Sequence, residues 1–141
     1  MFKAAAFALS ALALSGVASA AFAASPVGDW KTPSKNGVVH VSECGDSLCG
    51  KLIDGDDLRA TPGLTDKLNQ DASLRTRPLK GLPLFYGLKG GPTEWSGGSV
   101  YNPEDGKTYH GSIKLVDDNT LKLTGCVVAP FCKTQTWTRM N

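Results

Sequence analysis

Short runs of alternating hydrophobic and polar residues recur along most of this 141-residue chain. The clearest run is 108–116, where one set of alternate positions is mostly apolar and the other is polar: Tyr109, Gly111, Ile113 and Leu115 against Thr108, His110, Ser112 and Lys114. Residues 120–126 and 131–139 repeat the pattern. Since successive side chains of a strand point to opposite faces, a period of two predicts half-buried β-strands.

Eight runs rich in β-forming residues are separated by Gly, Pro, Asn and Asp, which is typical of an all-β sandwich or barrel. We place strands at Gly28–Thr32, Val38–Cys44, Leu48–Ile53, Leu82–Leu88, Glu94–Tyr101, Thr108–Val116, Thr120–Cys126 and Phe131–Arg139. The sharpest turn signal is Asn102–Gly106, where Pro103 presets the turn and Gly106 accepts a positive φ.

The stretch Asp54–Lys80 interrupts this pattern, because it is long, charged and punctuated by Gly and Pro. Within it, Asp71–Arg75 predicts one helical turn begun by an Asp cap. Two interpretations stay open: a loop that carries function, or an ordered crossover that covers one end of a barrel.

The N-terminus predicts an export signal. Lys3 supplies one positive charge, Ala4–Val17 is an almost unbroken apolar run, and small residues follow with A-x-A spacing. We expect a signal peptide at residues 1–23, cleaved after Ala23 or after Ala20, and no membrane span after cleavage.

The mature chain, residues 24–141, has 141 − 23 = 118 residues, enough for one domain. Its charge is 14 Lys and Arg, once Lys3 is removed, minus 13 Asp and Glu, or +1. This balance predicts neither a nucleic-acid partner nor attraction of the whole molecule to an anionic surface.

The four cysteines, Cys44, Cys49, Cys126 and Cys132, form two close pairs, each flanking a turn-like stretch. In an exported protein an even count predicts disulfides, and each pair is placed to staple a hairpin locally, worth about 2 kcal/mol by loop closure. Neither spacing is C-x-x-C, so we expect no zinc site and no redox site.

Four ordered blocks resemble the exported bacterial family called domain of unknown function 2147. They are Cys44–Gly50, Asp66–Asn69 with Leu74–Leu82, Trp95–Tyr109, and Gln135–Arg139. The likeness spans nearly all of the mature chain, although Gln70 stands where the family pattern usually has Pro.

This resemblance implies an eight-stranded antiparallel, lipocalin-like β-barrel and no established chemistry. Gly28-Asp29-Trp30 is also similar to the Gly-x-Trp of lipocalins, in which a Trp of the first strand closes one barrel end beneath an Arg of the last strand. Arg139 is placed for that role. We therefore interpret Trp30 and Arg139 primarily as a structural pair.

Candidate ligand-binding residues are aromatic. Trp95 and Tyr101 stand an even number of positions apart in one predicted strand, with small residues between, so we expect both on one face. With Tyr109, Trp30 and Arg139 they would line or close the barrel as a pocket wall. The alternative is that these rings are ordinary core.

The charged loop offers further candidates. Arg75 and Arg77 would meet a ligand carboxylate or phosphate, or else pair with Asp66, Asp71 or Asp57 and pin the loop. The acidic run at 54–57 does not predict calcium, because an EF-hand loop starting at Asp54 would place Arg59 at the required Gly.

The sequence contains no G-x-S-x-G, H-E-x-x-H or Gly-rich phosphate loop, and its histidines, His40 and His110, lie in predicted strands. We therefore predict no catalytic residues, no cofactor and no metal. The leading hypothesis is a periplasmic or secreted protein that binds a small apolar or amphipathic molecule. The alternatives are an envelope protein-interaction or maintenance module acting through the Asp54–Lys80 loop, and an enzyme of unknown type.

Overall fold

The structure is a computed structural model that describes residues 15–16, 24–128 and 130–140. Apart from residues 15–16, the expected signal peptide lies outside the described residues, so its cleavage remains a prediction. None of the helices in the described part of the chain is long and apolar enough to cross a membrane.

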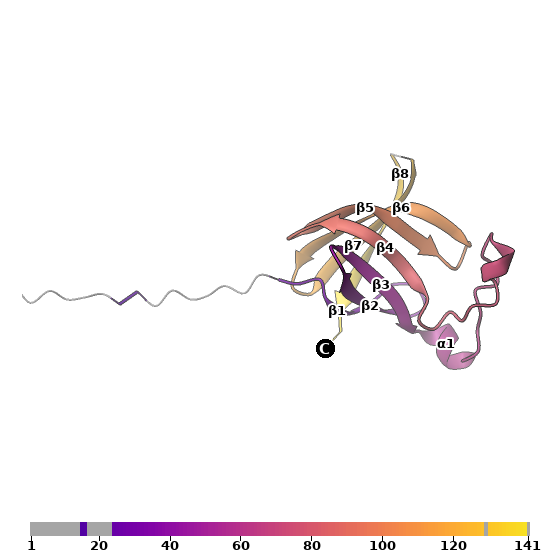
Figure 1. Ribbon diagram of the computed structural model, residues 1–141. Helices are drawn as coiled ribbons and strands as arrows, with labels where there is room; N and C mark the ends of the chain where they lie inside the picture. The colour runs from indigo at the N-terminus through magenta and orange to yellow at the C-terminus, as the bar shows by residue number, and fades with distance from the viewer. Residues whose placement is uncertain (1–14, 17–23, 129, 141) are drawn as a thin grey trace, which may run out of the picture.

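Eight antiparallel strands close into one barrel, in sequence order, as predicted (Figure 1). The strands are β1 (Gly28–Lys31), β2 (Val38–Cys44), β3 (Ser47–Asp54), β4 (Pro83–Gly90), β5 (Glu94–Asn102), β6 (Lys107–Asp117), β7 (Thr120–Val128) and β8 (Phe131–Arg139). All eight predicted strands are present, and their ends differ from the predicted ones by at most two residues.

Because the strands run up and down in turn, their connections alternate between two ends of the barrel. The N-terminal segment and the β2–β3, β4–β5 and β6–β7 turns lie at one end, which we call the floor. The β1–β2, β3–β4, β5–β6 and β7–β8 connections lie at the other end, which we call the mouth. The long loop between β3 and β4 belongs to the mouth (Figure 1).

Large apolar side chains from all eight strands fill the barrel above the floor, and the biggest fully buried ones are Trp30, Trp137 and Phe85. Gly50 is required by this packing, since a Cβ there would lie 2.2 Å from the Phe85 ring. This half of the barrel is a packed core, which the alternating pattern predicts.

One prediction about side-chain direction is wrong: Trp95 and Tyr101 do not share a face. A β-bulge between Ser96 and Gly98, with Gly97 at φ +79°, shifts the register of β5 against β6. An extra residue in one strand reverses the alternation beyond it. Trp95 therefore belongs to the barrel core, whereas Tyr101 is buried on the outer side, beneath the long loop.

The long loop contains a short α-helix, α1 (Asp56–Ala60), and a 3₁₀ turn, η1 (Ala72–Leu74). The helical turn is confirmed, and Asp71 caps it by accepting a hydrogen bond from the Ser73 backbone N–H at 3.0 Å. Helix α1 was not predicted, because its five residues follow a glycine cap with no side-chain hydrogen bond and carry no periodic signal.

The two predicted disulfides are present in the structure. Cys44–Cys49 links β2 to β3 at the floor, and Cys126–Cys132 links β7 to β8 at the mouth. Both therefore act within a hairpin and leave the pairing between distant strands to hydrogen bonds and packing.

The barrel closes between β1 and β8 through only two residue pairs, whereas β1 and β2 share four. Arg139 reinforces this seam. Its guanidinium carbon lies 4.3 Å from the centroid of the Trp30 ring, and its nitrogens donate to the backbone carbonyls of Val27, Ser25 and Asp118. The predicted stacking of Arg139 on Trp30 is present, at the floor of the barrel.

We expect Arg139→Ala to lower the free energy of unfolding by about 2 kcal/mol, because a stacked cation and charge-assisted hydrogen bonds are lost together. Arg139→Lys keeps the charge without the planar fork and should recover less than half of that loss. Urea unfolding followed by tryptophan fluorescence measures both. Lys122→Ala, on the exposed face of β7, is the control and should change stability by no more than about 0.5 kcal/mol. Equal effects of Arg139→Ala and Lys122→Ala on stability would contradict a stabilising role for the Arg139 contacts.

Candidate functional site

A cavity of about 930 Å³ opens at the mouth, above the packed floor. Its inner wall comes from side chains that point into the barrel, and its upper wall comes from the long loop. The apolar lining below the rim includes Leu52, Leu58, Leu64, Leu79, Leu84, Val100, Leu123 and Trp137. Small residues widen this end of the barrel, and Gly125 stands where a Cβ would lie 3.3 Å from the Cβ of Tyr109.

The loop reaches the cavity because its two arms are fastened together. The Asp66 backbone N–H donates to the carbonyl of Arg77 at 2.9 Å, and the Leu79 N–H donates to the carbonyl of Leu64 at 2.9 Å. This short antiparallel pairing, with a bridge between Thr65 and Pro78, places Leu64 and Leu79 on the cavity wall. Of the two interpretations of Asp54–Lys80, the structure shows an ordered cover of the mouth.

Asp66 anchors the loop to the barrel. Its side chain is fully buried and accepts hydrogen bonds from the Tyr101 hydroxyl at 2.5 Å, the Asn69 amide at 2.9 Å and Arg77 Nε at 2.9 Å. The Arg77 guanidinium also lies 5.2 Å from the centroid of the Tyr101 ring. Three hydrogen-bond donors, one of them cationic, offset the free-energy cost of burying this carboxylate. The same contacts fix the positions of the groups that touch it.

This environment also changes the acidity of Tyr101. Burial, together with the hydrogen bond to Asp66 and the negative charge of that carboxylate, raises the pKa of Tyr101 to about 12. The phenol therefore stays protonated and keeps donating to Asp66 at any physiological pH.

The polar groups of the rim fall into two sets. Five carboxylates are each held by a neighbour: Asp54 by Arg59, Asp56 by Asn36, Asp57 by Lys35, Glu104 by Ser34 and Asp105 by Tyr109. On β8, by contrast, Lys133 forms no ion pair with the described residues. Gln135 Oε1 accepts from Trp137 Nε1 at 3.0 Å, which leaves its amide N–H groups to face the cavity.

The seven predicted binding residues divide among three places. Tyr109 and Tyr101 border the mouth cavity. Trp30, Trp95 and Arg139 pack at the floor and do not line it. Arg75 and Arg77 lie outside the barrel: Arg75 Nε donates to the Asn69 carbonyl at 2.8 Å, and Arg77 pairs with Asp66, as the alternative interpretation held.

Sequence reasoning missed the β8 residues of the site. Gln135 and Trp137 occupy the inward set of positions in the alternating pattern of residues 131–139, so their side was predictable. Their position beside a cavity could not be predicted, since it depends on the width of the barrel at the mouth.

A closed eight-stranded up-and-down barrel with a packed floor and an open, apolar mouth is a lipocalin-like fold. The family model described as "Uncharacterized protein conserved in bacteria (DUF2147)" matches residues 28–139, so the chain belongs to this family. Its structure is similar to that of protein HP1028 from the human pathogen Helicobacter pylori, described as belonging to the lipocalin family. The two are 27% identical, cover 84% of each chain and superimpose with a TM-score of 0.74. Among curated proteins, no sequence matches this chain.

We expect Asp66→Ala to lower the free energy of unfolding by about 3 kcal/mol, because Arg77 and Tyr101 lose the group that compensates them. Trypsin should also cut faster after Arg75 as the loop loosens, whereas the bond after Arg77 resists trypsin because Pro78 follows it. Asp46→Ala removes an exposed carboxylate from a surface ion pair with Lys89 and serves as the control, with a loss of no more than about 1 kcal/mol. Unchanged cleavage in Asp66→Ala would contradict the anchoring role.

The raised pKa of Tyr101 predicts a pH dependence. The unfolded chain ionises this phenol near its ordinary pKa of 10, and the folded protein does so at about 12, so the folded state binds more protons between these values. The contribution of Tyr101 to the free energy of unfolding is therefore fully present below pH 10 and is lost as the pH rises toward 12. Urea unfolding across this range should show a steeper decline for the native protein than for Tyr101→Phe, and parallel curves would contradict the assignment.

Proposed function

We propose that this protein binds a small amphipathic molecule in the mouth cavity. The observation that carries the proposal is the cavity itself: about 930 Å³ of space with leucines and one tryptophan on its walls and polar residues at its rim, above a floor that is already filled. Pockets for small ligands typically measure about 300–1,000 Å³ and are mostly apolar with a few placed polar groups.

The apolar part of the ligand would lie deepest, against Trp137 and Leu123 from the barrel and Leu64 and Leu79 from the loop. Both sides of this wall are held rigidly, the first by the sheet and the second by the pairing at Asp66. A preformed wall favours binding because little conformational entropy remains to be lost when the ligand enters.

The polar end of the ligand would face the rim on β8. Lys133 is unpaired with any described carboxylate, and the Gln135 amide retains its donors, so together they would receive an acidic group. None of the described carboxylates across the rim is ion-paired with Lys133, and two of them, Asp54 and Asp57, are already paired with Arg59 and Lys35. This arrangement favours a molecule of fatty-acid type over a cation.

The predicted signal peptide and the two disulfides support a working place outside the cytoplasm, in the periplasm or the medium. The structural likeness to a protein described as a lipocalin agrees with a binding role. The anchored loop makes an interaction module acting through residues 54–80 the weaker alternative.

The proposal predicts that a dansyl-labelled fatty acid binds with energy transfer from Trp137, and that unlabelled fatty acid displaces it. Gln135→Phe, which fills the cavity from β8, should weaken binding at least about ten-fold by excluding the ligand from its place.

Thr136→Phe is the matched control, because Thr136 is the next residue of β8 and points outward opposite Lys122. It should bind like the native protein. No binding of any acidic amphiphile by the native protein, or equal loss in the two variants, would overturn the proposal.

A further inference from the structure

The large apolar side chains that are most exposed gather at one place. Among the described residues, Phe131, Val127, Val128 and Leu68 are the four most exposed of them, at 70, 66, 60 and 54%. Phe131, Val127 and Leu68 line the mouth cavity, and Val128 pairs with Phe131 across the β7–β8 hairpin. Single exposed apolar residues are ordinary, but a cluster confined to the rim of a pocket marks a contact surface.

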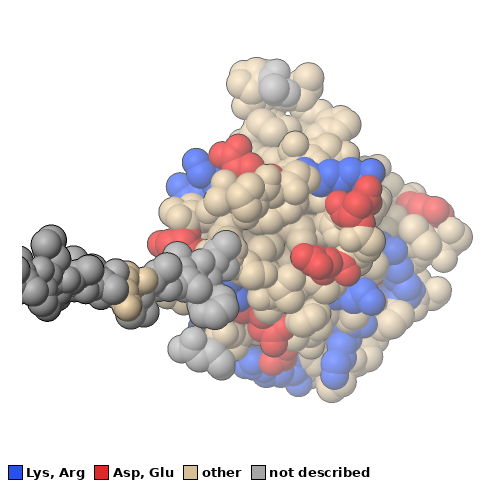
Figure 2. All heavy atoms as spheres, turned by 60° about the vertical axis from the view of Figure 1, so that its left-hand side comes forward, with Lys and Arg blue, Asp and Glu red and all other residues tan. Residues whose placement is uncertain are grey.

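The ends of β7 and β8, which contain three of these residues, extend beyond the rest of the barrel (Figure 1). In Figure 2 this tip projects at the top as a surface without charged atoms, and the charged side chains lie on the body below it. The Cys126–Cys132 disulfide closes the hairpin directly behind the tip. The tip therefore presents its apolar surface on a covalently closed hairpin.

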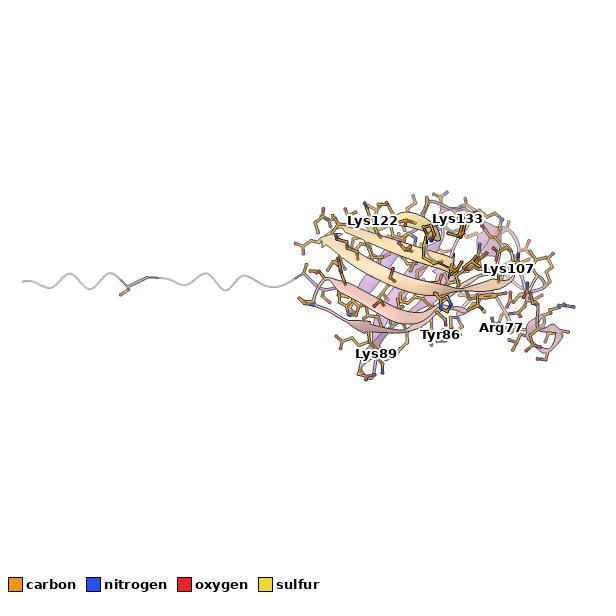
Figure 3. All side chains as sticks on the ribbon, turned by 90° about the horizontal axis from the view of Figure 1, so that it is seen from above. Arg77, Tyr86, Lys89, Lys107, Lys122 and Lys133 are labelled. Atoms are coloured by element: carbon orange, nitrogen blue, oxygen red, sulfur yellow. A yellow bond between two sulfur atoms is a disulfide. The ribbon has the colours of Figure 1, made fainter. Side chains whose placement is uncertain are left out.

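Basic side chains accompany the apolar ones at the mouth. Lys133 follows Cys132 directly, Lys67 precedes Leu68, and Lys107 begins β6 at the same end of the barrel (Figure 3). None of the three forms an ion pair with the part of the chain that the structure describes. Among the carboxylates of this rim, Asp54 and Asp57 are ion-paired with Arg59 and Lys35, whereas Asp56, Glu104 and Asp105 accept hydrogen bonds from neutral side chains.

We infer that the rim formed by Leu68, Val127, Val128 and Phe131 docks onto the surface of a lipid bilayer that contains anionic phospholipid. Apolar side chains at the tip would enter the boundary between headgroups and acyl chains, and Lys67 and Lys107 would contact lipid phosphates. A bilayer fits better than a globular partner, because the β7–β8 tip projects beyond the body as an apolar point, with basic residues at the same end of the barrel. Docking in this orientation turns the cavity toward the membrane.

The inference goes beyond ligand binding and is tested without a ligand. The native protein should co-sediment with vesicles of phosphatidylcholine and phosphatidylglycerol, and less with phosphatidylcholine alone. Val128→Ser should lower partitioning about ten-fold, because an apolar group no longer enters the lipid. Val116→Ser is the matched control, since Val116 is 48% exposed near the floor, and it should change partitioning less than two-fold.

Charge and insertion have separate readouts. Lys107→Gln should lower partitioning into the mixed vesicles about five-fold and leave phosphatidylcholine unaffected. Phe131→Trp places a fluorophore at the tip, while the native tryptophans are at most 8% exposed, so a blue shift with mixed vesicles and quenching by brominated lipid report insertion.

Equal partitioning of Val128→Ser and Val116→Ser would overturn the inference, and so would no vesicle binding by the native protein. A native dimer that Val128→Ser dissociates would overturn it in favour of a second copy of the chain. Fatty-acid binding should persist in Val128→Ser, because Val128 does not line the cavity, so failure of membrane docking is distinguishable from failure of the proposed binding function.

Discussion

Closure of the sheet between β1 and β8 is the constraint on which the rest of this structure depends. The seam has two residue pairs, and Arg139 strengthens it by stacking on Trp30 and holding the N-terminal segment and the β6–β7 turn. An open seam would expose the edges of two strands and remove one wall of the core. The packed floor and the shape of the cavity above it both require the closed barrel.

Within the closed barrel, side-chain size divides the interior into two halves. Trp30, Phe85 and Trp95 fill the half near the floor, and small or short residues such as Gly125 leave space near the mouth. The sheet alone does not enclose that space. The loop completes it, because Asp66 binds Tyr101 on the outside of the barrel and so places Leu64 and Leu79 over the opening. A buried polar contact outside the barrel thus shapes an apolar cavity within it.

The rim of the cavity takes part in both proposals, ligand binding and membrane docking. A ligand with an apolar body and an acidic end has low solubility as a monomer in water and resides largely in membranes. The rim that admits such a molecule also carries the most exposed apolar side chains of the described chain, on a hairpin closed by a disulfide. Exposed apolar surface at this position would be useful where the protein meets lipid, because contact with acyl chains removes that surface from water.

The sequence by itself determined the eight strands, the two disulfides and the cap of η1, because each depends on local alternation, local spacing or a local motif. The Trp30–Arg139 pair joins the two ends of the barrel and was predicted from the resemblance to the Gly-x-Trp of lipocalins. Only the tertiary structure decided on which side of the sheet each aromatic residue of β5 lies. One extra residue at Gly97 turned Tyr101 out of the barrel while Trp95 stayed inside, a shift of register that the alternating pattern does not reveal. It also decided that Asp66 is the partner of Arg77 and that Gln135 and Trp137 face open space, since pairing across a long loop and the width of a barrel are set by contacts between distant parts of the chain.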